Sequence, residues 1–334
     1  MTNMFSIFVS VSLAFWGQVY TSIPEVPLRL ARVYPSSRQE ATKLSAPTAM
    51  AIAPSGNIYV FDDGNSRIVK LSRNGTFIAQ FGEPGSGQSA IQRGGLSDSI
   101  AVDQKENVYI GNSVTPKVQV FTSNGRFVRS FRVPFPVTSI AVNTKREIYV
   151  AVTANSPTKL VLVFSETGKF LRQIGERLVS SNGRLARSLN KVVIACDLQD
   201  NLYLAFRSWP VIRKYSAGDI LVGEQQFEVP SYLVSESQRK NFSLDFIGKN
   251  ADTSFVLPLL THSIAVTGAR SNYLLLNAHS VIVFDSNCKV LRHFHFRAPR
   301  DRDNLFIGVA SAAKSRSLHF LDNRSGEIYE ALKL

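Results

Sequence analysis

A pattern of apolar and polar positions recurs along most of the chain. In each copy an Ala lies in a short apolar run, a polar turn follows, and a Tyr lies in the next apolar run, eight positions after the Ala. Five copies keep both residues, at Ala51, Ala101, Ala141, Ala195 and Ala265 and the Tyr that follows each; Ser311 and His319 mark a degenerate sixth. The runs are short and rich in β-branched and aromatic residues, which predicts strands.

The copies follow one another at intervals of 40 to 70 residues, a length that accommodates about four short strands. In the first unit the second, third and fourth strands are predicted at 58–61, 67–71 and 77–81. A tight turn precedes each fourth strand, and we expect its Gly to supply the positive φ that a short hairpin needs. The predicted residues are Gly75, Gly125, Gly168 and Gly218, with Ser286 and Asn287 in the fifth unit.

The two ends of the repeat region complement each other. The last unit, 306–334, has only three predicted strands, whereas the segment 28–34 has the pattern of a fourth strand without the first three. Pairing them would close a ring and remove both exposed edges, whereas a linear solenoid would need capping units. The sequence therefore predicts an all-β fold: one six-bladed β-propeller over residues 23–334, with four-stranded antiparallel blades, closed by an N-terminal strand.

The segment 58–68 reads IYVFDDGNSRI and resembles the repeat of the NHL family of propellers. Asp322 and Arg324 keep a remnant of the same motif in the last unit. The resemblance implies that Asp62, Asn65 and Arg67 form a structural cluster that ties the loop after the second strand to a neighbouring blade. It implies the fold and leaves the function open, because such propellers include both binding platforms and enzymes.

Residues 1–22 contain no charged side chain, and 4–16 reads MFSIFVSVSLAFW. An apolar core of this length is typical of a signal peptide, so we expect a protein that is secreted or located in the periplasm or cell envelope. A retained membrane anchor or a buried element of the fold are the alternatives. No other apolar run reaches the length of a membrane span.

The composition is that of a globular protein, with 44% hydrophobic and 19% charged residues among 334. Its two cysteines exclude a disulfide framework, and we expect Cys196 and Cys288 to be free thiols in different blades. We expect no cofactor.

The formal net charge is +13, from 38 Lys and Arg against 25 Asp and Glu. Many of these cations fall on predicted outer strands, Arg129 and Arg172 among them, which indicates a general basic surface. No basic stripe with interleaved aromatics occurs, so we expect no nucleic-acid partner. We expect at most weak association with anionic membrane surfaces, and a monomer.

The candidate catalytic residues do not converge. Among five histidines, only His262 and His279 fall where they could reach the central channel, and Asp103 and Asp197 are predicted to cap turns. The sequence therefore favours a binding scaffold over an enzyme. The alternative is a metal-assisted lyase or lactonase that works in the channel with the two histidines.

Three long connectors, 82–95, 175–190 and 229–262, join a fourth strand to the first strand of the next blade and therefore emerge on one face. Elongated loops on one face typically form the binding surface of a repeat array. We predict a site for an anionic polymer or an acidic protein segment there. Its candidate residues are Arg177, Arg184, Arg187, Arg207, Trp209 and Arg213.

Overall fold

The computed structural model describes residues 30–34, 43–93, 99–153, 159–179, 183–229, 259–267, 271–276, 280–295, 305–311 and 317–332. The signal-peptide prediction for residues 1–22 and the prediction for His279 lie outside these residues. Within them, no helix is long and apolar enough to cross a membrane.

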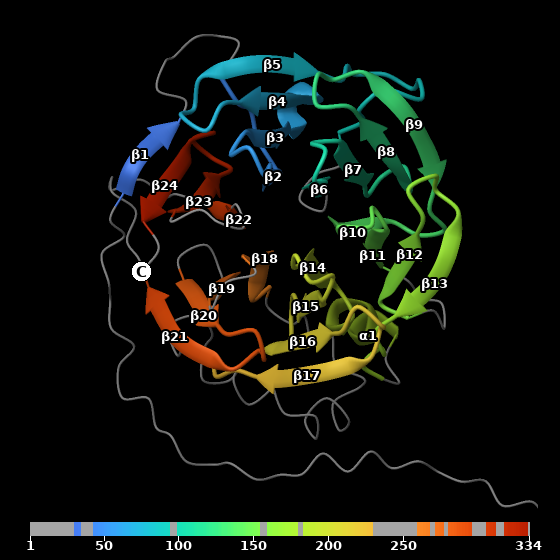
Figure 1. Ribbon diagram of the computed structural model, residues 1–334, viewed down its shortest axis with the longest axis vertical. Coiled ribbons are helices and arrows are strands. Elements are labelled where there is room, and N and C mark those ends of the chain that lie inside the picture. Colours follow the sequence, from blue (N-terminus) through green and yellow to red (C-terminus); the bar gives the residue numbers. More distant parts are fainter. Residues whose placement is uncertain are drawn as a thin grey trace, which may run out of the picture.

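The described residues form six four-stranded antiparallel sheets around a central axis, as predicted (Figure 1). In five blades the strands run from the axis outward in chain order, and in the sixth the N-terminal strand is outermost. Blade one contains β2 (Ala49–Ile52), β3 (Ile58–Asp62), β4 (Arg67–Leu71) and β5 (Phe77–Phe81); blade two contains β6 (Ser99–Val102), β7 (Val108–Asn112), β8 (Lys117–Phe121) and β9 (Phe127–Arg132).

The other blades repeat this order. Blade three contains β10 (Val137–Val142), β11 (Ile148–Val152), β12 (Val161–Phe164) and β13 (Phe170–Ile174); blade four contains β14 (Val192–Cys196), β15 (Leu202–Phe206), β16 (Val211–Tyr215) and β17 (Leu221–Gln226); blade five contains β18 (Thr261–Ala265), β19 (Asn272–Leu276), β20 (Ser280–Phe284) and β21 (Val290–His295); blade six contains β22 (Phe306–Ala310), β23 (Ser317–Asp322), β24 (Ile328–Leu332) and β1 (Leu30–Tyr34). A short helix, α1 (Gly183–Leu189), precedes β14.

The N-terminal strand closes the ring, as the sequence predicted. Strand β1 pairs antiparallel with β24, with Tyr34 opposite Ile328. The Tyr34 hydroxyl donates a hydrogen bond to Oε2 of Glu330 at 2.5 Å, and its ring stacks on His319 at 6.2 Å between centroids. Blade six is therefore built from both ends of the repeat region.

The hydrophobic core is a ring of clusters, each shared by two adjacent blades. One cluster joins Tyr59 and Phe61 of blade one to Ile110 of blade two, and others join each remaining pair of neighbours, including blades six and one. The second strands are buried along their length, as in β7, because they have a neighbouring blade on each face. A single blade would leave both of these faces exposed, so stability depends on the closed ring.

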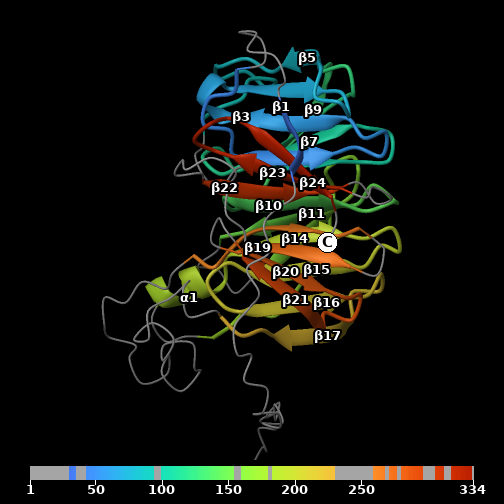
Figure 2. The same cartoon turned by 90° about the vertical axis from the view of Figure 1, so that its left-hand side faces the viewer.

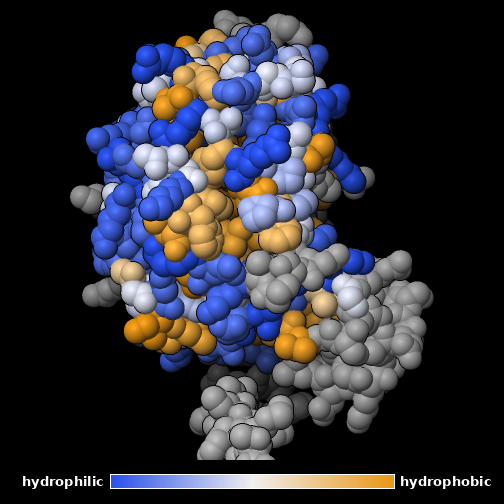
Figure 3. Space-filling view, turned by 90° about the vertical axis from the view of Figure 1, so that its right-hand side faces the viewer, coloured by the Kyte–Doolittle hydropathy of each residue, from blue (hydrophilic) through white to orange (hydrophobic). Residues whose placement is uncertain are grey.

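The outermost strands have a different pattern, because one face of each borders water. Most side chains of β13 and β17 are exposed or half-buried. In Figure 3 the rim that lies on the right of Figure 1 is mainly hydrophilic, with smaller hydrophobic areas. Exposed apolar side chains on the strands of this rim include Val128 and Leu171.

The turns before the fourth strands share one geometry, and it corrects two of the turn predictions. Gly75, Gly125 and Gly168 have positive φ, as predicted. In blade four the left-handed residue is Asp219 (φ 64) and not Gly218, and in blade five it is Cys288 (φ 68) and not Ser286 or Asn287. The left-handed residue in each case donates its N–H to the carbonyl three residues earlier, as Asp219 does to Ser216. The length of the hydrogen-bonded turn therefore determines which residue has positive φ, whether or not that residue is a glycine.

Glycine is required in some of these turns for a second reason. A Cβ on Gly75 would lie 1.7 Å from the ring of Tyr34, and one on Gly125 would lie 2.6 Å from Phe81. Both rings belong to the outermost strand of the preceding blade. The turn of one blade thus packs directly on the edge strand of its neighbour.

The Asp62 cluster is structural, as the family resemblance implied. The buried Asp62 carboxylate accepts hydrogen bonds from the Ser45 amide at 2.6 Å, from Nδ2 of Asn65 at 2.8 Å and from Nε of Arg67 at 2.8 Å. Nη2 of Arg67 also donates to the Lys43 carbonyl at 2.9 Å. The cluster therefore holds the connector that arrives from blade six.

Several basic residues of the outer strands bind the neighbouring blade. Nη1 of Arg172 donates to Glu147 at 2.7 Å within blade three, and its Nη2 donates to Asp219 of blade four at 3.3 Å. Lys70 donates to the Ser123 carbonyl of blade two at 3.0 Å, and Arg129 donates to the Glu166 carbonyl of blade three. Part of the basic excess therefore holds blades together.

Candidate functional site: the mouth of the central cavity

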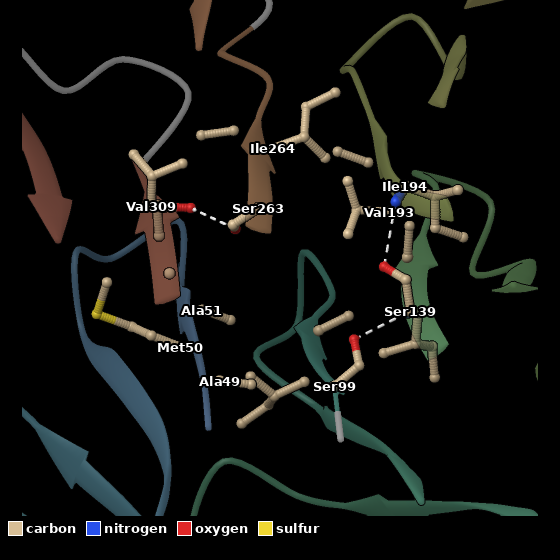
Figure 4. A pocket seen from close by; sticks show the side chains of 18 of the residues that line it. Ala49, Met50, Ala51, Ser99, Ser139, Val193, Ile194, Ser263, Ile264 and Val309 are labelled. Atoms are coloured by element: carbon tan, nitrogen blue, oxygen red, sulfur yellow. Dashed lines mark hydrogen bonds between the residues drawn. The ribbon is translucent and has the colours of Figure 1, made fainter. Parts of the chain in front are cut away.

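The innermost strands of all six blades surround a central cavity of about 330 Å³ (Figure 4). Its walls consist mainly of small and aliphatic side chains, such as Ala51, Ile140 and Val309. Small residues at these positions leave space at the axis, where six strands converge. We call the face of the disc at which the innermost strands begin the connector face, because the connectors from the preceding blades arrive there.

The serine hydroxyls of the wall serve to join neighbouring blades. Oγ of Ser99 accepts a hydrogen bond from the Ile140 amide at 2.9 Å, and Oγ of Ser139 accepts one from the Ile194 amide at 3.1 Å (Figure 4). Ser263 donates to the Val309 carbonyl at 3.3 Å. None of these three hydroxyls is paired with a general base in the described residues, so their hydrogen bonds explain their presence without nucleophilic chemistry.

Arg207 is fixed at the connector-face end of the cavity. It follows β15, and its amide donates to the Lys191 carbonyl at 2.8 Å, just before β14. Its carbonyl accepts hydrogen bonds from the amides of Leu260 at 2.7 Å and Thr261 at 3.0 Å, at the start of blade five. The backbone of Arg207 therefore joins blades four and five, and its side chain lines the cavity.

The Arg207 side chain is a buried cation without a counter-charge in the described structure. The residue is only 9% exposed, and its Nε is buried without a hydrogen-bond partner. No Asp or Glu is among the described residues that line the cavity. Burial lowers the pKa of its guanidinium, which nevertheless stays protonated because arginine does not lose its proton in proteins.

Two further polar side chains line the same end of the cavity. Burial, and then the charge of Arg207, lower the pKa of His262 to about 4, so its imidazole is neutral at pH 7. The Thr48 hydroxyl is buried and has no hydrogen-bond partner within the described ranges. One fixed positive charge and two neutral polar groups thus face a largely apolar space, which suits an anionic group more than a cation.

Trp209 lies in the core and offers no exposed ring. It is 3% exposed and belongs to the cluster between blades three and four, together with Leu185 and Leu189 of α1. Trp209 was predicted to lie in a binding loop because arginines stand beside it in the sequence. The structure instead uses it to seat α1 on blade four.

Arg213 is held in contacts with its own blade and with blade three. Its guanidinium lies over the Phe206 ring at 5.0 Å. It donates from Nε to Glu224 at 2.5 Å and from Nη1 to the Glu176 carbonyl at 2.7 Å. These contacts are structural, and the cavity lining includes Arg207 but not Arg213.

The other predicted arginines lie on the connector between blades three and four. Arg187 is exposed in the last turn of α1, and Arg177 is half-buried on the same connector, where burial lowers its pKa. Of Arg184, also in α1, the structure describes only the backbone. In the edge-on view α1 projects on one side of the disc (Figure 2).

The sequence did not reveal that Thr48 lines the cavity, or that Arg207 is buried with an unpartnered Nε in the described structure. Thr48 stands just before an innermost strand, a position that alone says little. The signal for Arg207 is stronger, because a cation directly follows the fully buried strand LYLAF. A charge placed there has little access to water.

The described residues offer no ready metal site. No three His, Cys, Asp or Glu side chains among them come together as a ligand set. His293 and His295 lie on the outermost strand β21, away from the cavity, and His319 is buried in blade six. His262 therefore has no histidine or carboxylate partner along the described cavity wall.

Both cysteines are free thiols, as predicted. Cys196 lines the cavity, and burial raises its pKa well above the usual value. Cys288 is buried in the outer turn of blade five, where burial raises its pKa to about 12. Neither is a thiolate at neutral pH, so neither suits a nucleophilic role.

Comparisons with known proteins support the fold and not a particular activity. No family profile matches the sequence, and no curated protein matches it. Among solved structures, selenomethionine-substituted virginiamycin B lyase from Staphylococcus aureus is 11% identical, with a TM-score of 0.53 over 86% of this chain and 80% of that one. The WD40 repeats of RRP9 are 9% identical, with a TM-score of 0.56 over 93% of this chain and 100% of that one. The chain is thus similar in fold both to a lyase and to a propeller built of WD40 repeats.

Proposed function

We propose that this protein is a binding module whose connector face takes an anionic ligand, an anionic polymer or an acidic segment of a protein, with one anionic group at Arg207. The observation that carries the proposal is the state of Arg207, a guanidinium at the cavity mouth whose buried Nε has no acceptor among the residues that the structure describes. An unpaired ion buried in a protein costs several kcal/mol, which a bound anion would offset.

The surroundings of Arg207 support this assignment. Charge-assisted hydrogen bonds to a carboxylate are about twice as strong as neutral ones, and more so where water is excluded. Arg187 and Lys191 are exposed on the connector that leads into blade four, where they add a weaker, salt-screened attraction. Trp209 and Arg213 act in this proposal as supports of α1 and of blade four.

The proposal is tested by the binding of fluorescently labelled poly-L-glutamate at increasing salt, with neutral poly-L-glutamine as the reference. We expect binding of poly-L-glutamate only, weakened at least tenfold by Arg207→Met. Arg132→Met is the matched control, because Arg132 is exposed on β9 and has no ion pair in the described structure. An equal loss of affinity in the two variants would show that only the general positive charge of the surface binds poly-L-glutamate, and would overturn the site at Arg207.

Arg129 and Arg172 are unsuitable as controls, although both lie on outer strands. Each bonds the neighbouring blade, so a loss of affinity there could reflect a loosened ring. Arg187→Ser is the variant that probes the connector. We expect it to weaken binding less than Arg207→Met, since an exposed cation is screened by salt.

We further propose that the chain is an exported NHL-type propeller. The motif around Asp62 and its structural role support the family, and the uncharged apolar segment 4–16 supports export. N-terminal sequencing of the protein recovered from the envelope or medium of expressing cells tests export. We expect a new terminus near residue 23; an intact Met1 on protein retained in the cytoplasm would contradict it.

The second candidate function is a metal-assisted lyase or lactonase, supported by the presence of His262 in the cavity. Elemental analysis of the purified protein separates it from the binding module. A stoichiometric metal that is lost in the His262→Ala and His279→Ala double variant would favour the enzyme. If the purified protein contains no such metal and still binds poly-L-glutamate, the binding module is favoured.

A further inference from the structure

The central cavity is more than the mouth at which Arg207 lies. Its volume of about 330 Å³ falls in the range of small-molecule sites, about 300–1,000 Å³. The described wall is aliphatic along the innermost strands, with contributions from Met50, Ile100, Ile140, Val193, Ile264 and Val309 (Figure 4). The structure therefore combines one cationic end with an apolar interior.

The polar groups of the cavity specify the charge of what it can hold. Arg207 supplies a single positive charge, and the Thr48 hydroxyl is a second buried group without a partner in the part of the chain that the structure describes. His262 and the hydroxyls of Ser99, Ser139 and Ser263 add no charge. A single guanidinium neutralises one negative charge, and the second charge of a phosphate dianion would remain uncompensated in an apolar space.

We propose that the cavity binds a monocarboxylate with an aliphatic body, its carboxylate at Arg207 and its hydrocarbon chain between the innermost strands. This inference rests on the proposed function, because it uses Arg207 as the anion receptor, and adds the chemical class of the bound group. The ligand is a free small acid or the carboxylate-bearing end of a larger partner. In either case the apolar body leaves water when it enters the cavity and packs against Ala51, Ile140 and Val309.

The test is a calorimetric titration with a homologous series: acetate, butanoate, hexanoate and octanoate. We expect affinity to rise about fourfold for each methylene that enters the cavity, the fold-change that corresponds to burying one CH₂. Hexan-1-ol and hexyl phosphate are the references for a missing charge and for a dianion. Hexanoate should bind at least tenfold more tightly than either.

Two variants locate the binding. Arg207→Met should reduce hexanoate binding to the level of hexan-1-ol, while Arg132→Met should leave it unchanged. Ala51→Leu narrows the cavity at a wall residue and should weaken octanoate more than acetate. Thermal melts establish that each variant is folded; should Arg207→Met not fold, the series on the unmodified protein and on Arg207→Lys still decides the proposal.

Each outcome separates the two levels of the account. An affinity that does not depend on chain length, with salt-sensitive binding of poly-L-glutamate intact, overturns the cavity inference and leaves the proposed function. Hexyl phosphate that binds more tightly than hexanoate overturns the assignment of a monocarboxylate. If neither the acids nor poly-L-glutamate bind, both the inference and the proposed function fail.

Discussion

Arg172 on the outermost strand of blade three donates a hydrogen bond from Nη2 to Oδ1 of Asp219, in the outer turn of blade four, at 3.3 Å. The same guanidinium donates to Glu147 at 2.7 Å, and this hydrogen bond lowers the pKa of the Glu147 carboxyl. Asp219 also occupies the left-handed position of its turn. One residue thus sets the shape of a turn and joins two blades.

We expect Arg172→Met to reduce the free energy of unfolding by about 1–2 kcal/mol, because it removes a network of half-buried, charge-assisted hydrogen bonds. The exposed Arg132→Met should change it by less than about 0.5 kcal/mol. Urea unfolding measures both. Equal small effects would show that the inter-blade contact of Arg172 carries no stability.

The two roles of Asp219 can be separated by substitution. Asp219→Gly removes the carboxylate but suits the left-handed backbone, whereas Asp219→Ala removes the carboxylate and strains the backbone. We therefore expect the Ala variant to be less stable than the Gly variant by about 1 kcal/mol, measured by urea unfolding. A Gly variant that is less stable than the Ala variant would contradict the role of the positive φ.

Because β1 closes the ring, we expect this strand of five residues to contribute strongly to the stability of the whole protein. Tyr34 is fully buried and packs against Gly75 of blade one, so Tyr34→Ala should cost about 3–5 kcal/mol. Deletion of residues 1–35 should expose the edge of β24 and yield insoluble protein. A soluble truncated protein with a cooperative melt would contradict closure by this strand.

Two half-buried histidines predict a loss of stability in acid. Burial lowers the pKa of His262 and of His293 from 6.5 to about 4, with smaller electrostatic contributions from Arg207 to His262 and from His295 to His293. Between pH 6.5 and 4 the unfolded chain binds these protons and the folded protein does not, so the free energy of unfolding falls as the pH falls.

Each histidine contributes up to about 3 kcal/mol to this loss, which is complete near the folded pKa. The measurement is urea unfolding at several values of pH, on the unmodified protein and on the His262→Gln and His293→Gln double variant. The variant should lose less stability between pH 6.5 and 4. Parallel curves for the two proteins would mean that the histidines are accessible to protons in the folded state.

The sequence predicted the fold well because the fold is repetitive. Six copies of one pattern report on the same strand order, and the short last unit requires the strand around Tyr34. The turn at Gly218 was assigned wrongly, because residue type alone was used where the hydrogen-bonded length of the turn places Asp219.

The candidate site was less accessible to sequence reasoning. Arg207, Trp209 and Arg213 stand close together in the chain, but they lie in three different environments: the cavity, the core and an inter-strand ion pair. Which of them lacks a partner depends on residues of other blades. Thr48, which belongs to the same cavity end as Arg207, is more than 150 positions away in the chain.

The central claim is that Arg207 is an anion receptor, and the NMR signal of its Nε–H group tests it most directly. Arg207→Lys assigns the signal, and the exposed Arg132 serves as the internal reference. When hexanoate or poly-L-glutamate is added, we predict a downfield shift of the Arg207 proton and slower exchange with water, because the buried Nε–H gains an acceptor. An unchanged Arg207 signal while the same ligand binds by calorimetry would contradict the account.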